Sequence, residues 1–463
     1  MTTTLCEQLA DLALGTPPAA IDPTALERAQ MVLASTLGSA AAGHEIESAR
    51  ILRDLELSDG GAGNATVWFS DRKLPLRAAA RVNAVASDAA ASDDSDLRSI
   101  AHIGTVVSTV SMALAEVCGS TGEDVLAGIV LGYEVAGRID ESLTPNRMQR
   151  GFHGSVSTVF GGVVSGGLLL GLDRTTLAHA LSLAATSIGG MAMAADTSWA
   201  REYHAGLSAS TAVNALLAAR AGFRSELAVL ESPRGFLQAL GAQDVKAVTA
   251  GWGDDWDILT DMAVKLMPGA HPFHATAEAA SDAAAMARTE GPLRLEDIAA
   301  VEISAAVQWT HFQGDPHPRN LVDAAHSIVY FVAAAIVDGA FGWQHMDVGK
   351  MADPDIGALQ DKVVFDPDPP PLPDRFPHRH GGAVSITLAN GRRFRAECRS
   401  PRGSGPRGVA WNDIHDKLHH LMPACGLQKP AIDRCLQALR ELRPAPGLDR
   451  LVETIRMVNA VPT

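Results

Sequence analysis

From Ala19 to about Met262, the chain consists of Ala-rich segments whose apolar residues recur at the spacing of a helix. Short polar breaks such as Ser58 to Gly61 separate these segments. Several segments are apolar on most faces, which is typical of helices at the centre of a bundle. The sequence therefore predicts a mainly α fold with a large helical bundle.

The pattern changes after Lys265. Strand-like alternation appears in residues 297–305, 383–388 and 393–398, and the last two flank the hairpin signal Ala389-Asn390-Gly391. A helical run at 323–339 and a Pro-rich linker at 366–377 lie between the strands, and helical spacing returns from Trp411. We predict a helical domain of residues 1–262 plus 405–463, with a smaller α+β lid domain, residues 263–404, inserted before the C-terminal helices.

Charge and cysteine content exclude several kinds of protein. The chain has 38 Lys and Arg against 53 Asp and Glu, a net charge of −15, which disfavours nucleic acid as a partner. The five cysteines are odd in number and form no CxxC pair, so we expect neither a disulfide framework nor a thiolate zinc site. Because disulfides are rare in the reducing cytoplasm, we expect a cytoplasmic location. No basic region and apolar run of a secretory signal opens the chain.

Residues 155–172 carry no charge and must be weighed as a membrane span. Five of them are glycine, and a polar Gly-Phe-His-Gly precedes them. We predict a buried helix of the bundle and no contact with a membrane.

Polar residues that could perform chemistry gather in four clusters, at 92–102, 150–154, 201–206 and 265–274. In the first, carboxylates precede His102 at the start of an uncharged helix; a solvated turn with helix caps is an equally good interpretation. His153 is either a satisfied histidine at a helix start or a ligand group. Lys265 is either a surface residue or a desolvated base, and the nearby His271 and His274 favour the base.

Common catalytic motifs are missing. GxxxxGK[ST], HExxH and GxSxG do not occur, which removes their support for nucleotide, zinc-protease and hydrolase chemistry. We also expect no pair of histidines spaced i, i+4 for a metal on one helix. A metal is therefore not required.

Taken in order, several blocks resemble the MmgE/PrpD family over nearly the whole chain. No single block is specific, but their order is. The blocks are Gly132-Tyr133-Glu134, Gly151-Phe152-His153, Leu169 to Asp173, His204-Ala205-Gly206, Ala221-Gly222-Phe223, Leu230 to Phe236 and Ser327 to Tyr330.

The resemblance implies a helical domain with a lid domain, a homodimer, and a site between the domains with neither metal nor organic cofactor. It implies small polycarboxylate substrates and removal of a proton from carbon next to a carboxylate, or the decarboxylative counterpart. The residues carried over are Asp93, His102, His153, Lys265, His271 and Tyr330.

The chain also departs from the pattern of the dehydratase and decarboxylase members. Ala91 and Ser95 stand where those members have Asp and Thr, Ile103 follows His102 in place of Pro, and Arg201 replaces a Lys. Arg201 cannot act as a base but can hold a carboxylate in two bonds. These departures favour another reaction of the family.

We predict a cofactor-independent epimerase of a small amino- or imino-dicarboxylate such as iminodisuccinate. Lys265 and Tyr330 would exchange the α-proton from opposite sides, with His102 and Asp93 also catalytic. The chain is acidic, so we expect its few cationic groups to be concentrated where a polyanionic substrate binds. The predicted substrate-binding residues are Arg201, His153, His271, His204 and Ser95.

Two alternatives remain open. One is a dehydratase of the 2-methylcitrate type or a decarboxylase of the cis-aconitate type; the other is a polycarboxylate-binding relative without catalytic activity. The tail histidines His415, His419 and His420 have no role in any of these interpretations.

Overall fold

The computed structural model describes residues 3–98, 100–187, 189–307, 314–371, 381–405 and 407–456. The chain divides into two compact units. Unit 1 comprises residues 1–264 and 410–463, and unit 2 comprises residues 265–409. These boundaries lie two residues (264 − 262) and five residues (409 − 404) from those that the sequence suggested.

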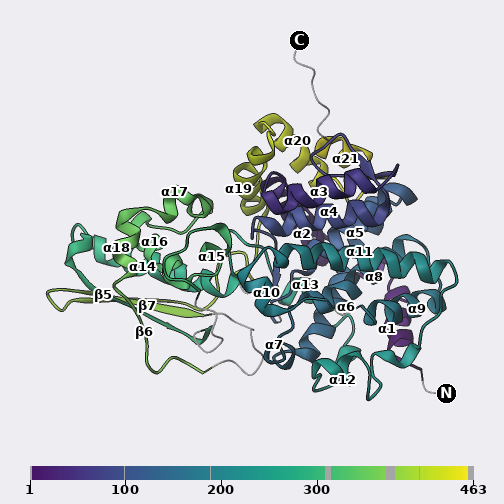
Figure 1. Ribbon diagram of the computed structural model, residues 1–463, viewed down its shortest axis with the longest axis horizontal. Helices are drawn as coiled ribbons and strands as arrows, with labels where there is room; N and C mark the ends of the chain where they lie inside the picture. The colour runs from purple at the N-terminus through teal and green to yellow at the C-terminus, as the bar shows by residue number, and fades with distance from the viewer. Residues whose placement is uncertain are drawn as a thin grey trace, which may run out of the picture. The chain divides into compact units, whose positions relative to one another are not determined.

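Unit 1 is built of helices joined by short turns (Figure 1). Its α-helices are α1 (Leu5–Leu14), α2 (Pro23–Gly43), α3 (Glu47–Asp59), α4 (Leu76–Ala89), α5 (Ile103–Cys118), α6 (Gly122–Leu143), α7 (Asn146–Gln149), α8 (Ser155–Leu169), α9 (Arg174–Ala185), α10 (Ala192–Thr197), α11 (Ala200–Arg220), α12 (Phe236–Leu240), α13 (Asp257–Thr260), α19 (Trp411–Leu421), α20 (Lys429–Arg440) and α21 (Asp449–Ile455). Two antiparallel strand pairs join them: β1 (Ala65–Thr66) with β2 (Lys73–Leu74), and β3 (Ser95–Asp96) with β4 (Met262–Ala263).

Local sequence sets where these helices begin. The Asp22 side chain accepts the backbone N–H of Thr24 at the start of α2, and Asp173 accepts that of Thr176 at the start of α9. Both carboxylates satisfy amides that have no partner inside the helix. Each aspartate therefore caps the helix that follows it.

Helix α8 contains most of the uncharged stretch at 155–172, and its residues 155–167 are buried. Glycines let its neighbours approach closely, because a Cβ at Gly161 would lie 2.7 Å from the carbonyl oxygen of Gly132 on α6. The buried-helix interpretation is confirmed. Within the described part of the chain, no helix is long and apolar enough to cross a membrane.

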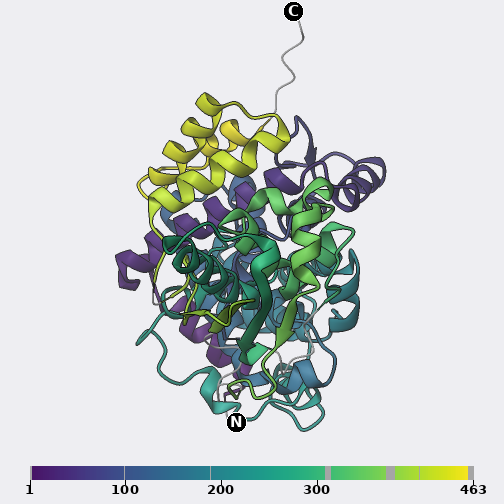
Figure 2. The ribbon, with the colours of Figure 1, turned by 90° about the vertical axis from the view of Figure 1, so that its left-hand side faces the viewer.

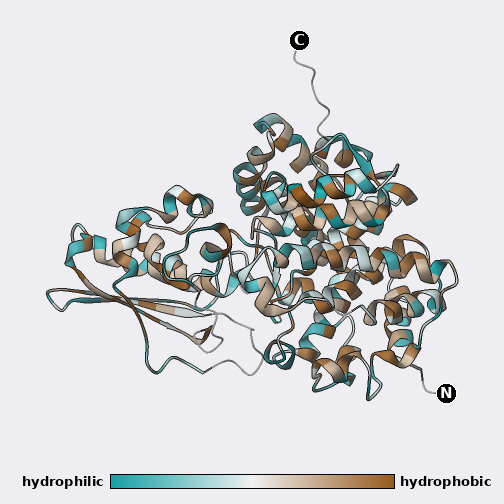
Figure 3. Ribbon diagram, in the orientation of Figure 1, coloured by the Kyte–Doolittle hydropathy of each residue, from teal (hydrophilic) through white to brown (hydrophobic). Residues whose placement is uncertain are grey.

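The C-terminal helices return to unit 1, as the sequence predicted. Figures 1 and 2 show these yellow helices beside the purple N-terminal ones, and α19 packs on α2. Both α19 and α20 carry hydrophilic and hydrophobic turns (Figure 3). In α19 the apolar side chains of Ile414, Leu418 and Leu421 are buried, the arrangement of an amphipathic surface helix, and Lys417 is buried with them.

Unit 2 contains a four-stranded sheet with helices against it (Figure 1). Its strands, in sheet order, are β6 (Val363–Phe365), β5 (Ile298–Ala305), β7 (Gly382–Leu388) and β8 (Arg393–Cys398); β6 runs parallel to β5, and the other pairs are antiparallel. Its α-helices are α14 (His274–Thr289), α15 (Leu321–Ala325), α16 (Ile328–Asp338), α17 (Val348–Met351) and α18 (Pro354–Gln360). The strand at 297–305 and the hairpin around Asn390 are confirmed.

One element differs from its prediction. The helical run expected at 323–339 is two helices, α15 and α16, because the chain breaks at His326 and Ser327. The Ser327 side chain accepts the backbone N–H of Tyr330 and so starts a new helix. The end of the Pro-rich linker, from 372, lies outside the described residues. The mainly α fold with a small α+β part is confirmed.

Candidate active site in the helical unit

The acidic loop between α4 and α5 is buried. Residues 92 to 96 are each at most 1% exposed, so the solvated-turn interpretation is wrong. Two non-glycine residues beside the loop, Ala91 (φ 50°) and Ile100 (φ 53°), adopt the left-handed conformation, which strains a β-branched residue such as isoleucine. Such strain persists only where the surrounding structure enforces it, and it is common at functional sites.

Asp93 and His102 form a hydrogen-bonded pair. Nδ1 of His102 lies 2.8 Å from Oδ2 of Asp93, and the Thr105 hydroxyl donates to the same oxygen at 2.8 Å. His102 stands directly before α5 and Thr105 lies in its first turn, so the helix start aims both groups at the carboxylate. When Nδ1–H donates to Asp93, Nε2 carries the lone pair of a base. The pair has the chemistry of a general base with its orienting carboxylate.

Asp94 is fully buried between the start of α5 and Tyr133 on α6. Its Oδ2 accepts the backbone N–H of Gly104 at 3.2 Å and the hydroxyl of Tyr133 at 3.1 Å. A Cβ at position 104 would lie 2.1 Å from Oδ1 of Asp94, so only glycine admits this carboxylate. Burial and the neighbouring charge of Asp93 raise the pKa of Asp94 to about 6, against the effect of His102 and the two hydrogen bonds.

This shift predicts a pH-dependent stability. Because the folded state binds the Asp94 proton more tightly than the unfolded chain does, its contribution is fully present below pH 3.8 and is lost as pH rises through about 6. Asp94→Asn removes the titration, so its unfolding free energy, measured with urea, should rise relative to that of wild type between pH 3 and pH 8 by up to roughly 3 kcal/mol, about half of it above pH 5. Asp71→Asn, on the exposed surface, is the matched control. A constant difference between wild type and Asp94→Asn across this range would contradict the prediction.

Three histidines from separate elements form a row. The rings of His102 and His153 are stacked with centroids 6.1 Å apart, and those of His153 and His204 lie 5.9 Å apart. His153 precedes α8 and His204 lies on α11. The structure therefore brings together three histidines that the sequence predicted for the site.

The turn that carries His153 is fixed from two sides. Arg147 pairs with Asp140 through both carboxylate oxygens, at 2.8 and 2.7 Å, and donates to the carbonyl of Phe152 at 3.1 Å. At Gly154 a Cβ would lie 2.9 Å from Cα of Ala101, so the turn lies directly against the residue before His102.

His153 and His204 are not cationic clamps. Burial, with smaller contributions from the charges of His102 and Arg147, holds the pKa of His153 well below its usual value. Burial also lowers the pKa of His204, although Asp88 opposes it. At neutral pH both rings are neutral, so each can offer a carboxylate one N–H but no positive charge.

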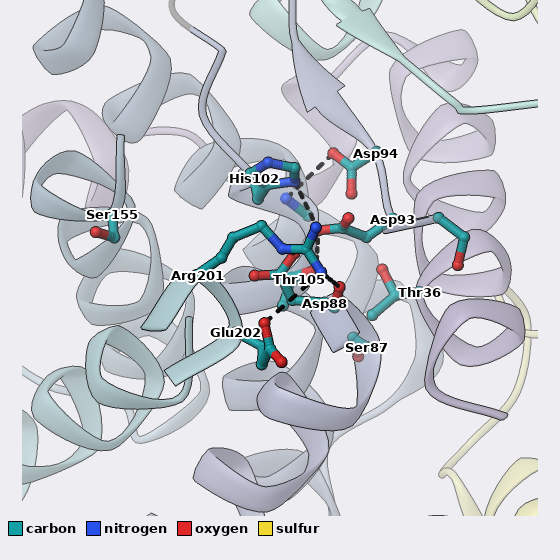
Figure 4. A network of polar contacts seen from close by, with 12 residues as sticks. Thr36, Ser87, Asp88, Asp93, Asp94, His102, Thr105, Ser155, Arg201 and Glu202 are labelled. Atoms are coloured by element: carbon teal, nitrogen blue, oxygen red, sulfur yellow. Dashed lines mark hydrogen bonds and ion pairs between the residues drawn. The ribbon is translucent and has the colours of Figure 1, made fainter. Parts of the chain in front are cut away.

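Arg201 has partners within the protein (Figure 4). Its Nη2 donates to the carbonyls of Asp88 and Ala89 at 2.9 and 3.2 Å, and ion pairs link it to the side chains of Asp88 (3.4 Å) and Glu202 (3.7 Å). Burial lowers the pKa of Arg201, but the carboxylates of Asp88, Glu202 and Asp93 outweigh it and raise that pKa overall. Arg201 thus compensates a buried acidic cluster, which differs from the predicted grip on a substrate carboxylate.

Asp88, Asp93 and His102 offer ligand atoms within 4.8 Å of one another, close enough for a metal ion. The guanidinium of Arg201 already lies among these carboxylates and would repel a second cation. The protein's own guanidinium therefore neutralises this group, which disfavours a metal ion there.

Ser95 is part of β3, where its Cα pairs with that of Ala263. The residue is buried, and its hydroxyl has no hydrogen-bond partner in the described part of the structure. The structure does not join it to the histidine row.

The other predicted residues belong to unit 2. Lys265 follows β4 by two residues and is 2% exposed, so the surface interpretation is wrong. His271 and His274 are both buried, with ring centroids 4.5 Å apart, at the start of α14.

Tyr330 lies in the core of unit 2. It is fully buried in the apolar core of unit 2, where its hydroxyl donates to the carbonyl of His345 at 2.8 Å. Burial, with the charge of Asp338, raises the pKa of Tyr330 further above its usual value. Its role in a two-base pair stays a prediction, and in this structure its hydroxyl is bound to a backbone carbonyl.

Sequence reasoning missed two residues that hold this site together, Lys417 and Thr105. Lys417 is 2% exposed and donates to the Ser35 hydroxyl at 2.8 Å and to the carbonyl of Ser92, next to Asp93, at 2.5 Å. Thr105, three residues after His102 in a predicted helix, could have been found from its spacing. Lys417 gives no such signal, since its partner lies 325 residues away.

Comparison with known proteins shows the family of this chain. The MmgE/PrpD N-terminal domain model matches residues 7–248, and the MmgE/PrpD C-terminal domain model matches residues 271–438. The cis-aconitate decarboxylase of Mus musculus is 25% identical over 367 residues, which cover 77% of this chain and 74% of that protein. The cis-aconitate decarboxylase of Aspergillus terreus is 25% identical over 294 residues, covering 60% of this chain and 59% of that protein. The two family models together span most of the chain, which therefore belongs to the MmgE/PrpD family.

Proposed function

We propose that this protein is a lyase that acts on a small polycarboxylate without a cofactor, in the manner of a cis-aconitate decarboxylase. The observation that carries the proposal is the buried Asp93–His102 pair, completed by Thr105 and facing the ring of His153. The similarity to decarboxylases over most of the chain supports the same class of reaction.

His102 would move the proton. As a neutral imidazole its Nε2 takes a proton from carbon, and Asp93 stabilises the imidazolium that forms. In a decarboxylation His102 would instead begin as the imidazolium: the bond to the departing carboxylate breaks, CO2 leaves, the electron pair stays in the carbon skeleton, and the imidazolium gives its proton to that carbon and is reprotonated by water. The neutral His153 and His204 would donate N–H groups to substrate carboxylates.

The second candidate is the epimerase of an amino- or imino-dicarboxylate. The substitutions at Ala91, Ser95 and Arg201, relative to the pattern of lyase members, favour it. An epimerisation needs two proton carriers on opposite faces of one carbon. The hydroxyl of Tyr330, the predicted partner of Lys265, is bound to the carbonyl of His345, and the similar proteins are decarboxylases, which is why the lyase is the first proposal.

One panel of substrates separates these candidates. Purified protein is incubated in D2O with cis-aconitate, 2-methylcitrate, citrate and an imino-dicarboxylate, while CO2 release, ultraviolet absorbance and deuterium incorporation are measured. If the protein is a lyase, it should release CO2 from a substrate or change the ultraviolet absorbance by forming or removing a conjugated double bond. Deuterium at the α-carbon with a change in optical rotation, and no CO2, would indicate the epimerase instead. No conversion of any substrate would favour a non-catalytic polycarboxylate-binding protein.

We further propose that the protein acts as a homodimer, as the family resemblance implies. Large apolar side chains at Met191, Met193, Trp199 and Tyr203 are at least 48% exposed, more than a surface usually leaves in one short segment. Light scattering should give twice the chain mass of 48.5 kDa; a monomer at micromolar concentration would refute the proposal.

A further inference from the structure

Two histidines of the C-terminal tail lie one turn apart on the same helix. His415 and His419 occupy positions i and i+4 of α19, and their ring centroids are 4.3 Å apart. The sequence-based expectation that no such pair exists was therefore wrong. Residues four apart share a helix face, which is why this spacing is used for metal ligands.

A carboxylate from the next helix completes the group. Asp433 lies on α20, and its Oδ1 is 2.9 Å from Nε2 of His419. His415, His419 and Asp433 each offer a ligand atom, and these atoms all lie within 4.8 Å of one another. Two ligands bound 2.0–2.2 Å from a tetrahedral zinc ion stand about 3.4 Å apart, so small side-chain rotations would suffice.

We propose that His415, His419 and Asp433 bind a divalent transition-metal ion of the zinc type, with water as the fourth ligand. Two imidazoles and one carboxylate suit zinc, whereas Mg²⁺ and Ca²⁺ prefer oxygen ligands alone. Nδ1 of His415 lies 3.0 Å from Oδ1 of Asp416, and donation to that carboxylate fixes the tautomer whose Nε2 can bind metal. All three ligands are accessible, with side chains 44%, 18% and 51% exposed.

The ion would join α19 to α20. Lys417 lies between the two histidines in the sequence, two residues from each. Its side chain donates to the carbonyl of Ser92, which precedes Asp93 of the Asp93–His102 pair. Residues two apart on a helix do not share a face, so substitutions at the metal site leave this contact intact. The metal site thus links the surfaces of two C-terminal helices and does not include the Asp93–His102 pair.

The test uses the full chain without an affinity tag, freed of metal with EDTA and titrated with Zn²⁺ at pH 7.5 by calorimetry. Wild type should bind one ion at this site, and His419→Gln should weaken that binding at least about 100-fold, since even an outer-shell change costs 10–100-fold. Asp433→Asn should weaken it as well. Bound Co²⁺ should show the intense visible absorption of a tetrahedral centre in wild type and lose it in His419→Gln.

Two controls make the outcome decisive. His420→Gln alters the neighbouring histidine, whose Nδ1 lies 2.9 Å from the carbonyl of Asp416, and should bind Zn²⁺ like wild type. His102→Gln should also retain this ion, which separates the site from the Asp88–Asp93–His102 group. Without metal, His419→Gln should match wild type in unfolding midpoint and in activity. Equal Zn²⁺ stoichiometry and affinity in wild type and His419→Gln would overturn the proposal, as would failure of wild type to bind.

Discussion

Replacing His102 by Gln should lower kcat/KM about 10²–10⁴-fold for whichever substrate the panel identifies, because it removes the group that moves the proton. Asp93→Asn should produce a loss of similar size. The amide cannot stabilise the imidazolium by charge, and it can present an N–H to Nδ1 and so reverse the tautomer. Steady-state rates at substrate concentrations below and above KM give both constants.

Further variants show whether the effect belongs to the pair. Thr105→Val removes the hydrogen bond from the Thr105 hydroxyl to Asp93 Oδ2 and should cost less than the loss of His102. His179→Gln changes a buried histidine of α9, whose Nδ1 accepts the N–H of Ser225 at 3.3 Å, and should leave the rates near those of wild type. If His102→Gln and Asp93→Asn both keep activity within about threefold of wild type, the assignment of the base is wrong.

Arg201→Met should be the most destabilising of the proposed substitutions. It would leave Asp88 and Glu202 buried without their cation, and breaking a buried ion pair from one side costs about 3–5 kcal/mol. Chemical or thermal unfolding of the full chain, followed by circular dichroism, measures this loss of unfolding free energy. Arg201→Lys keeps the charge but loses the forked geometry that reaches both Asp88 and Ala89, so its loss should be smaller.

An exposed arginine provides the matched control. Arg174 pairs with Asp11 and Glu7, but its side chain is 41% exposed. Because water and salt screen such pairs, Arg174→Met should change the unfolding midpoint little. A substrate-binding role for Arg201 would give the opposite pattern: Arg201→Met would fold as stably as wild type, with KM raised.

Much of the site could be predicted. His102, His153 and His204 stand in polar clusters before or within helices, and the structure brings them into one row. The spacing of His102 and Thr105 places both at one helix start. The role of Arg201 could not be predicted, because a guanidinium suits a substrate carboxylate and a protein carboxylate equally well, and only packing chooses between them.

Tyr330 shows the same limit. Its Ser-x-x-Tyr block suggested a catalytic hydroxyl, yet the serine caps α16 and the tyrosine fills the core. A local pattern records which residues stand near each other along the chain. It does not record whether a polar group meets substrate or a backbone carbonyl such as that of His345.

The sequence by itself determined the helical bundle, the strands of the smaller unit and the family, since periodicity and motif order are local properties of the chain. Only the tertiary structure decided which buried charges compensate each other. The contacts of Arg201 with Asp88 and of Lys417 with Ser92 span 113 and 325 residues. The physical reason is that a buried polar group must find a partner wherever the fold supplies one, and that partner is fixed by packing between distant segments.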